Sequence, residues 1–517
     1  MAVTSKMNLL KAGTLTRRRA STDDIAPAGG RLERRWLALI VLCSSALMIV
    51  LDTTIVNVAL PSIRQSLGFS ATSLAWVVNA YTLTFGGTLL LGGRLGDLFG
   101  QRRLFLVGLT IFTLASLACG LSPSQEWLVT ARVIQGIGGA IVSAVSLSLI
   151  MNLFTESAER AKAMGVFGFV AAGGGSVGVL LGGVLTSVLN WHWIFLVNLP
   201  IGIVAFALSL ILLPSDRGLA NGARLDIAGA ITITASLMLA VYAIVNGNQV
   251  GWTSGQTISQ LAAAVALLAI FLIVEARVRS PLMPLGLFRL RNVATANVVG
   301  VFWTAALFGW FFLSALYLQL VLGYSPLQVG LAFLPTNIIM AVFSLSLSAR
   351  LVMRFGIKLP LVVGLLMAAI GLALFARAPV GGNFVVDVLP AMMFLGFGGG
   401  LAFNPILLAA MNDASPEESG LASGVVNTSF MMGGALGLAI LASLAASRTS
   451  GLLASGSNHL VALNSGYQAA FLIGALFAIF ASGLGAALLR IKAQPATLSV
   501  EESVNEEMIN EPCVVRE

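Results

Sequence analysis

Long apolar stretches alternate with short polar connections along most of this chain. Fourteen of these stretches hold about 20 mainly apolar residues, the length that a helix needs to cross the hydrocarbon core of a bilayer. The pattern therefore predicts fourteen transmembrane helices. Their expected bounds are 36–58, 73–93, 104–121, 127–152, 162–188, 194–213, 226–246, 258–277, 294–321, 328–350, 358–377, 387–411, 421–446 and 469–490.

Composition excludes a water-soluble fold. Of the 517 residues, 57% are hydrophobic and 10% are charged, whereas an ordinary soluble domain carries about 25% charged residues. Residues 1–35 form a basic polar stretch, and the apolar run that follows is long enough to span a bilayer. We therefore expect a retained cytoplasmic tail and not a cleaved signal. Residues 491–517 are polar and end in several glutamates, so we expect a disordered acidic cytoplasmic tail.

The distribution of Lys and Arg predicts the orientation. With both termini in the cytoplasm, 25 of the 29 basic residues fall on the cytoplasmic side, where they are enriched in membrane proteins. Arg64, Arg377 and Arg448 fall outside, and Arg132 lies within a span. The net charge of +8 thus reflects membrane topology and does not require a nucleic-acid partner. We expect a multi-pass protein of a cell membrane whose surroundings are the lipid bilayer.

Three segments of the first half recur in the second half in the same order. Residues 67–70 match 322–325, residues 94–100 match 350–356, and residues 159–178 match 418–437, at offsets of 255, 256 and 259. The repeat predicts two six-helix bundles, at 36–213 and 294–490, with an inserted transmembrane hairpin and its linkers at 214–293. Two related half-bundles are typical of transporters that work by alternating access to a central site.

Four segments also carry a family resemblance. They are Gly93–Arg103 (GRLGDLFGQRR), Leu51–Pro61 (LDTTIVNVALP), Arg132–Gly139 (RVIQGIGG) and Trp191–Pro200 (WHWIFLVNLP). On these residues, the chain from about 36 to 490 resembles the major facilitator superfamily, and specifically its fourteen-helix drug:proton antiporter branch. The resemblance implies an all-α membrane fold and proton-coupled multidrug efflux. One departure is Val179, which stands where the branch usually has a proline associated with bending helix five and limiting leak, so coupling and export direction stay open.

An ionisable residue inside a spanning helix is costly and is a functional hypothesis by default. Asp52 is such a residue, and in a water-lined cavity it could load and release a proton. Helical rise puts Asp52 about 24 Å in from the cytoplasmic edge and Arg132 about 7.5 Å in from the opposite edge of a layer about 30 Å thick. The two charges are therefore expected at similar height. Arg132 would sense the protonation of Asp52 directly or through Gln135 or Asn57; the alternative is a fixed ion pair that only secures packing.

A second expected site is the polar loop after the second span. In the family its acid, here Asp97, is thought to meet the positive end of a helix in the other half, which maps to Ser419–Ser423. The matching position of the repeat is Met353, so this contact would be one-sided. The alternative is a solvated loop charge. The expected gate residues are Gly93, Arg94, Asp97, Gly100, Arg102 and Arg103.

Two further groups of residues complete the expected sites. Glycines at four-residue spacing predict close helix packing, and they could also form the sliding interface between the halves: Gly174, Gly178, Gly182, Gly183, Gly433 and Gly437. Aromatic, amide and thioether side chains that could line a central pocket for apolar ligands are Trp303, Trp310, Phe311, Tyr317, Asn404, Met431 and Met432. Most such side chains instead face lipid or neighbouring helices.

The remaining chemistry narrows the choice of function. Asp226, Glu275 and Asp387 lie near span ends, so the middle of the spans offers one carboxylate, and monocationic or neutral lipophilic substrates are favoured over doubly charged ones. Cys43, Cys119 and Cys513 have no metal-type spacing, and no phosphate-binding loop or nucleophile triad occurs. We therefore expect no cofactor, no enzyme activity and a transporter that functions as a monomer. A transporter dedicated to one metabolite or self-made antibiotic, and a non-transporting sensor or scaffold, stay open as alternatives.

Overall fold

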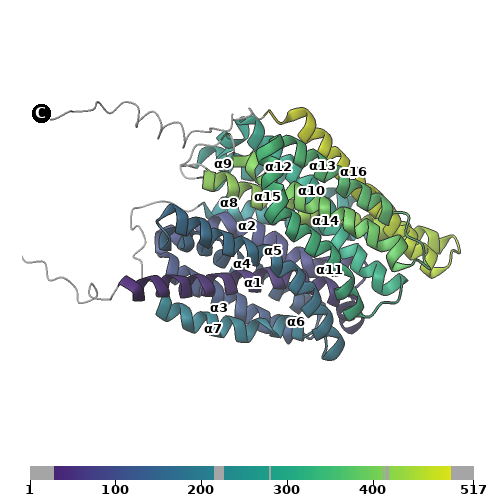
Figure 1. Cartoon of the computed structure of the whole chain (residues 1–517). Coiled ribbons are helices and arrows are strands. Elements are labelled where there is room, and N and C mark those ends of the chain that lie inside the picture. Colours follow the sequence, from purple (N-terminus) through teal and green to yellow (C-terminus); the bar gives the residue numbers. More distant parts are fainter. Residues whose placement is uncertain (1–27, 215–225, 279–280, 412, 414–418, 491–517) are drawn as a thin grey trace, which may run out of the picture.

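The computed structural model describes residues 28–214, 226–278, 281–411, 413 and 419–490. Within these ranges the regular structure is helical and contains no β-strand. The first half of the chain forms α1 (Ala28–Leu67), α2 (Trp76–Phe99), α3 (Gln101–Gly120), α4 (Gln125–Leu153), α5 (Ser157–Val188), α6 (Trp193–Leu196) and α7 (Asn198–Leu212), with the short 3₁₀ turn η2 (Ser73–Ala75) before α2 (Figure 1).

Two helices follow as a hairpin, and the second half comes after them. The hairpin consists of α8 (Ile227–Val250) and α9 (Gly255–Arg277), and the turn η3 (Leu285–Arg289) leads out of it. The second half forms α10 (Arg291–Leu316), η4 (Tyr317–Val321), α11 (Pro326–Val342), η5 (Phe343–Leu347), α12 (Ser348–Phe355), α13 (Lys358–Phe375), η6 (Phe384–Val388), α14 (Leu389–Met411), α15 (Ser419–Ala454) and α16 (His459–Leu488).

These helices confirm an all-α integral membrane fold. Thirteen helices among the described residues are long and apolar enough to cross a membrane. The predicted span at 328–350 corresponds to α11, which has 17 residues and is continued by the π-helical turn η5 and by α12. The structure corrects some expected bounds. Helix α1 begins at Ala28, inside the predicted tail, and α16 begins at His459, ten residues before the expected span.

The packing of helices repeats between the halves. In the first half α1 packs on α5 and α3 packs on α4; in the second half α10 packs on α15 and α13 packs on α14. The halves also share their turns. Gly68 and Gly323, one repeat apart, both have φ of 74°, and Gly100 and Gly356 have φ of 94° and 74°. These left-handed conformations suit glycine, which has no β-carbon, and they explain why the repeat is visible in the sequence at these positions.

The halves meet along two helix pairs related by the same repeat, α5 with α11 and α2 with α15. In the first pair, the amide N–H of Leu327 donates to the Ser187 hydroxyl over 3.1 Å. In the second pair, a β-carbon on Gly86 would come within 2.8 Å of Cβ of Met431. The inserted hairpin lies outside the second pair, because α8 packs against both α2 and α15.

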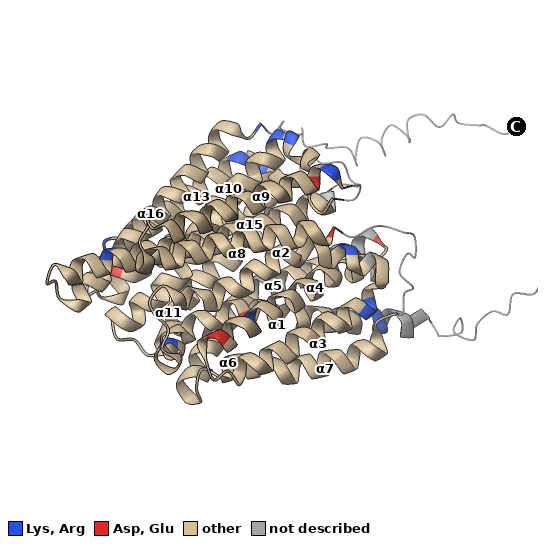
Figure 2. Cartoon of the chain, turned by 180° about the vertical axis from the view of Figure 1, so that it is seen from behind, with Lys and Arg blue, Asp and Glu red and all other residues tan. Residues whose placement is uncertain are grey.

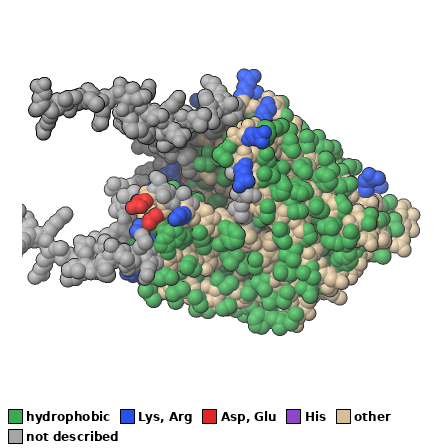
Figure 3. Space-filling model, in the orientation of Figure 1, with side chains coloured by type: hydrophobic (Ala, Val, Ile, Leu, Met, Phe, Trp, Pro, Cys, Tyr) green, Lys and Arg blue, Asp and Glu red, His purple; other side chains and the backbone are tan. Residues whose placement is uncertain are grey.

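We call the side of the molecule at which α1 begins and α16 ends the tail side. Backbone and side-chain contacts tie elements together there, as Arg490 N–H donates to the Asn292 side chain at the start of α10 over 3.0 Å. Most of the Lys and Arg residues of the described chain gather on this side (Figure 2). The space-filling view shows an apolar surface and a recess between the halves on the tail side (Figure 3).

Candidate functional site

A buried polar cluster in the first half joins Asp52 of α1 to three other helices. Arg132 of α4 donates from Nη1 to Asp52 Oδ2. Gln135, one turn further along α4, donates from Nε2 to Asp52 Oδ1 over 2.8 Å. Asn198, the first residue of α7, donates to the same oxygen over 3.3 Å. Both carboxylate oxygens are therefore bonded to donors, and one of these donors is charged.

The arginine is held independently of the carboxylate. Its Nε donates to the backbone carbonyl of Val77 over 2.9 Å, and its Nη1 also donates to Gln135 Oε1 over 2.9 Å. The guanidinium carbon lies 4.3 Å from the ring centroid of Tyr81, a distance at which a cation is attracted by the aromatic face. The guanidinium thus has three partners besides Asp52.

This cluster is closed to solvent. Asp52 has an exposed fraction of 0% and Arg132 of 1%. Ser116 of α3 accepts from both Gln135 (3.1 Å) and Asn198 (3.0 Å), so the side chains of α3, α4 and α7 surround the carboxylate. The expectation of a water-lined cavity around Asp52 does not hold in this arrangement of the helices, because donor side chains occupy the space that water would take.

The cluster contains residues that sequence reasoning missed. The structure brings together Asp52, Arg132 and Gln135 as expected, and it adds Asn198 and Ser116. The sequence offered one indication of Asn198, since this residue lies in the Trp191–Pro200 segment that carries the family resemblance. The sequence offered no indication of Ser116, because a serine in an apolar helix usually bonds to the backbone of its own helix. Asn57 does not join the cluster: its amide donates to the carbonyls of Thr53 and Thr54, one turn earlier in α1.

The expected gate lies at the tail-side end of α2. The expected polar loop is helical as far as Phe99, the last residue of α2. Only Gly100 separates α2 from α3. Arg94 and Arg103 are exposed, and Arg102 donates to the carbonyl of Leu210 at the end of α7. The side chains of Asp97 and Ser419 lie outside the described part of the structure. A β-carbon on Gly93 would have no neighbour within 4 Å.

The glycine rows pack helices within each half, which corrects the expectation of a sliding interface. A β-carbon on Gly178 would come within 3.2 Å of the Leu51 backbone in α1, and one on Gly437 within 2.2 Å of Ala305 Cα in α10. Gly174 and Gly182 likewise face α1, and Gly433 faces α10. Gly183 is different, because it faces α11 of the other half, 2.7 Å from the Pro326 carbonyl oxygen.

Val179 lies at the same contact between the halves. Helix α5 continues through this position from Ser157 to Val188. The carbonyl oxygen of Val179 lies 3.0 Å from the position that a β-carbon would take on Gly330 of α11. Close packing of α5 on α11 here therefore involves a helix without a proline at this position.

The aromatic residues expected around a central pocket belong instead to the core of the second half. Trp303, Trp310 and Tyr317 are fully buried. Trp310 contacts the rings of Phe311 and Phe333, with centroids 4.4 Å and 5.6 Å apart. The Tyr317 hydroxyl donates to the Pro379 carbonyl over 2.9 Å. Periodicity could not separate a core face from a cavity face, because both are apolar.

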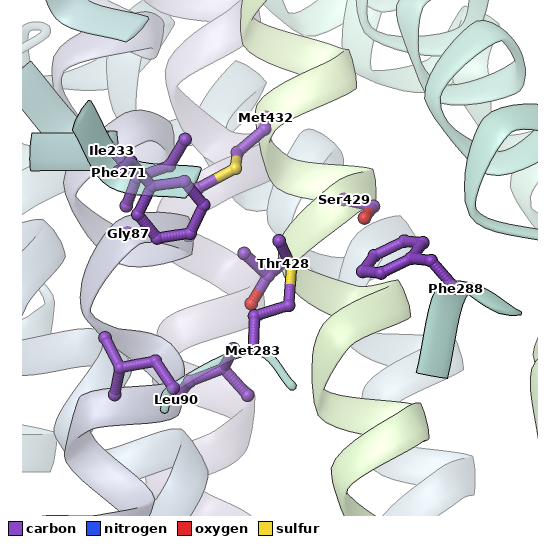
Figure 4. A pocket seen from close by; sticks show the side chains of 11 residues that line it. Gly87, Leu90, Ile233, Phe271, Met283, Phe288, Thr428, Ser429 and Met432 are labelled. Carbon is purple, nitrogen blue, oxygen red and sulfur yellow. The ribbon is translucent and has the colours of Figure 1, made fainter. Parts of the chain in front are cut away.

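The other three candidates have separate surroundings. Asn404 of α14 donates to the Ser344 carbonyl over 2.7 Å, so its amide ties α14 to the π-helical turn η5. Met431 lies at the contact of α15 with Gly86 of α2. Met432 lines a cavity of about 110 Å³ outside that contact, between α2, α15 and the inserted hairpin (Figure 4).

The chain matches a known family of membrane proteins over most of its length. The model of the Major Facilitator Superfamily matches residues 42–438, more than three quarters of the chain. The chain belongs to the major facilitator superfamily. This superfamily member is 39% identical over 472 residues to the puromycin resistance protein pur8 of Streptomyces alboniger, covering 91% of the chain and 93% of that protein. It is 38% identical to the cephamycin export protein CmcT of Amycolatopsis lactamdurans, covering 82% and 87% of the two chains.

Solved structures agree on the fold of this superfamily member. The structure of an auto-inhibited peptide transporter of the POT family superposes with a TM-score of 0.62 at 17% identity, covering 89% of this chain and 99% of that one. The protein is thus a multi-pass membrane transporter whose relatives are antibiotic resistance and export proteins. It is not an enzyme, and the described residues contain no group of three or more potential metal ligands.

Proposed function

We propose that this transporter is a proton-coupled exporter of lipophilic, monocationic or neutral compounds, in a bacterial cytoplasmic membrane with both termini in the cytoplasm. The observation that carries the proposal is the Asp52–Arg132 ion pair, buried with its hydrogen-bond partners inside the first half. A buried ion pair contributes little net stability compared with apolar packing. Its presence in a membrane-spanning helix is therefore better explained by a functional change of charge.

The cluster supports a cycle in which Asp52 binds and releases a proton. Protonation removes the negative charge from Asp52, and the guanidinium of Arg132 remains bonded to Val77 and Gln135 and stacked on Tyr81. Both protonation states thus leave the buried arginine with partners. Because Asp52 is enclosed here, exchange of its proton with water requires another arrangement of the halves, which would link protonation to alternating access.

Helix α1 supplies a path from the cluster to the other half. Val58 lies six residues after Asp52 on α1, and its carbonyl accepts a hydrogen bond of 2.9 Å from Gln319 in η4. A shift of α1 caused by breaking the ion pair would therefore change a contact between the halves. This route uses one helix and one hydrogen bond, so it can be interrupted at Gln319 without touching the carboxylate.

The end of α2 is proposed as the conformational gate. A β-carbon on Gly424 of α15 would come within 2.7 Å of Leu90 Cδ2. The end of α2 and the beginning of α15 therefore lie together on the tail side. A carboxylate of Asp97 at the N-terminus of α15 would gain about 0.3–1 kcal/mol from the helix dipole. Asp97→Asn should then lower turnover far more than the amount of protein in the membrane, and unchanged turnover would contradict a gate.

Transport by purified protein in proteoliposomes tests proton coupling. An imposed pH gradient should drive uphill movement of ethidium, a lipophilic monocation, and addition of ethidium should cause counter-movement of protons. Asp52→Asn should abolish both while leaving folded protein that still binds ethidium. The matched control is Asp387→Asn, which removes a carboxylate at the far end of the second half, where it accepts from the Asn383 N–H over 2.7 Å.

Three outcomes separate the candidate functions. Uphill transport that survives Asp52→Asn would contradict this residue as the coupling site. Absence of transport for every compound offered, with protein that folds and inserts, would favour a sensor or scaffold. Transport restricted to one compound in a panel that includes puromycin would favour a dedicated exporter, an alternative supported by relatives named for resistance to, or export of, single antibiotics.

A further inference from the structure

Two acidic side chains of the inserted hairpin meet inside the protein. Asp226 caps the N-terminus of α8, and its Oδ1 accepts from the Gly229 N–H over 2.7 Å. Glu275 lies near the end of α9, and its Oε2 accepts from the Met283 N–H over 3.2 Å. Their exposed fractions are 4% and 3%. Both acids are therefore removed from water at the end of the hairpin.

The other oxygen of each acid has no donor. Asp226 Oδ2 and Glu275 Oε1 are buried and form no hydrogen bond with the described part of the chain. Both oxygens lie beside Gly229, because a β-carbon on Gly229 would come within 2.4 Å of the first and 3.0 Å of the second. Ionised carboxylates only accept hydrogen bonds, whereas a protonated carboxyl also donates one. A single proton held between these two oxygens would therefore satisfy both of them.

No cation replaces this proton among the described residues. The charged side chains of the elements packed around the pair are Arg277 on α9, Arg289 on η3 and Arg94 on α2, and all three are exposed. None of them forms an ion pair with Asp226 or Glu275 in the part of the chain that the structure covers. Helix α15 carries one charged residue, Arg448, near its other end. Two buried like charges with no counter-ion among the described residues disfavour double ionisation.

The pair lies next to the cavity under the hairpin. Ile233, one turn after Gly229, and Phe271, one turn before Glu275, both line this cavity, as does Met283 itself (Figure 4). Thr428 of α15 also lines it; its side chain is 6% exposed and its hydroxyl has no partner. The opposite wall is formed by Gly86, Gly87 and Leu90 of α2. Glu275 thus bonds to the Met283 amide in a segment that lines the cavity beside the α2–α15 contact.

We propose that Asp226 and Glu275 form a second proton-binding site, separate from Asp52, which holds one proton between the two carboxyl groups and fastens the inserted hairpin to the segment at Leu282–Met283. The reaction is –COOH···⁻OOC– giving two –COO⁻ and one released H⁺. Release of the proton leaves two negative charges facing each other, and their repulsion moves Glu275 away from Asp226 together with the Met283 amide that is bonded to it. The segment then separates from α2 and α15, and the cavity opens.

Infrared spectroscopy of the purified full-length protein tests the proton directly. At neutral pH the spectrum should contain a C=O stretch of a protonated carboxyl group that shifts in D₂O. Asp226→Asn and Glu275→Gln should each abolish this band, and both variants should stay folded, because the amide donates to the remaining carboxylate in place of the proton. Asp387→Asn, the matched control, should keep the band.

A band that is missing at neutral pH in the unmodified protein would overturn the proposal, whether both acids are ionised or another cation sits between them. So would a band that is lost in Asp52→Asn and kept in both hairpin variants, since that proton would belong to Asp52. A band lost in the hairpin variants while ethidium transport also fails for Asp52→Ala and Asp52→Asn supports two separate proton sites.

Movement of the segment is tested by labelling a cysteine at residue 283. In a protein carrying Cys513→Ser and Met283→Cys, the maleimide labelling rate at each pH is divided by that of the same protein with Asp226→Asn. The division cancels the pH dependence of the thiol. The ratio should rise severalfold from acid to alkaline pH, and a ratio that stays constant would contradict release of the segment.

Discussion

The guanidinium of Arg132 on α4 donates to the carboxylate of Asp52 on α1, a residue 80 positions earlier in the chain. Both side chains are enclosed, and Gln135 bonds to each of them. The carboxylate depends on the arginine, because Asp52 alone would be an uncompensated charge in a medium of low dielectric constant, whereas Arg132 also bonds to Val77 and Gln135.

Arg132→Ala should lower the free energy of unfolding by about 3–5 kcal/mol, since it leaves the buried Asp52 without its counter-charge. Adding Asp52→Asn should recover part of this loss, because the remaining group is then neutral. Thermal melting of the single and double variants in detergent measures both effects. A double variant that is no more stable than Arg132→Ala would contradict electrostatic dependence between the two residues.

Gly437→Ala should destabilise the second half by about 1–3 kcal/mol through overpacking. The new methyl group would lie 2.2 Å from Cα of Ala305, which is backbone and can move only if α10 and α15 separate. The control is Gly483→Ala on α16, where a β-carbon has no neighbour within 4 Å. That change should be neutral or stabilising by about 0.5–1 kcal/mol, since alanine favours helix over glycine. Melting temperatures compare the two.

Gly183→Ala should shift the balance between arrangements of the two halves. Its β-carbon would lie 2.7 Å from the Pro326 carbonyl oxygen, so the α5–α11 contact opens while contacts inside the first half are kept. Spin labels at Val188→Cys and Leu331→Cys should report a longer mean distance than in the parent protein. Gly165→Ala, on the same helix with no neighbour within 4 Å, should leave the distance unchanged.

Tyr317→Phe should cost about 0.5–1.5 kcal/mol of stability, because it removes one buried hydrogen bond, to the Pro379 carbonyl. Its effect on transport should be the same for every substrate, because the ring belongs to the core of the second half. Transport rates for ethidium and puromycin give the ratio to compare. A change in that ratio would indicate that Tyr317 contacts the substrate after all.

Much of the fold could be predicted from the sequence, because each spanning helix is a run of about 20 consecutive, mainly apolar residues. Local apolar length set the number of spans, and the repeated glycine turns at Gly68 and Gly323 exposed the two related halves. The ends of helices were less accurate. Helix α16 starts at His459, where the Asn458 side chain caps it. Hydropathy alone does not detect such a cap, because the capping residue is polar.

Some residues of the candidate sites could likewise be predicted from the sequence, and others could not. The cost of a charge in lipid singled out Asp52 and Arg132 from the sequence, since few residues share that cost. Ser116 and Asn198 joined them only through the packing of α3 and α7 against α4. The sequence leaves Trp310 and Tyr317 open between a pocket and the core, because an apolar helix face has the same composition whether it meets a neighbouring helix or a ligand.

The sequence by itself determined that this protein crosses a membrane many times, that segments of its first half recur in its second half, and that one acid and one arginine lie inside spanning helices. The reason is that membrane insertion acts on local segments of the chain. Only the tertiary structure decided which groups meet across helices, including the enclosed Asp52 and the facing carboxyls of Asp226 and Glu275. Those contacts depend on how helices rotate and pack against each other, and no local pattern specifies that rotation.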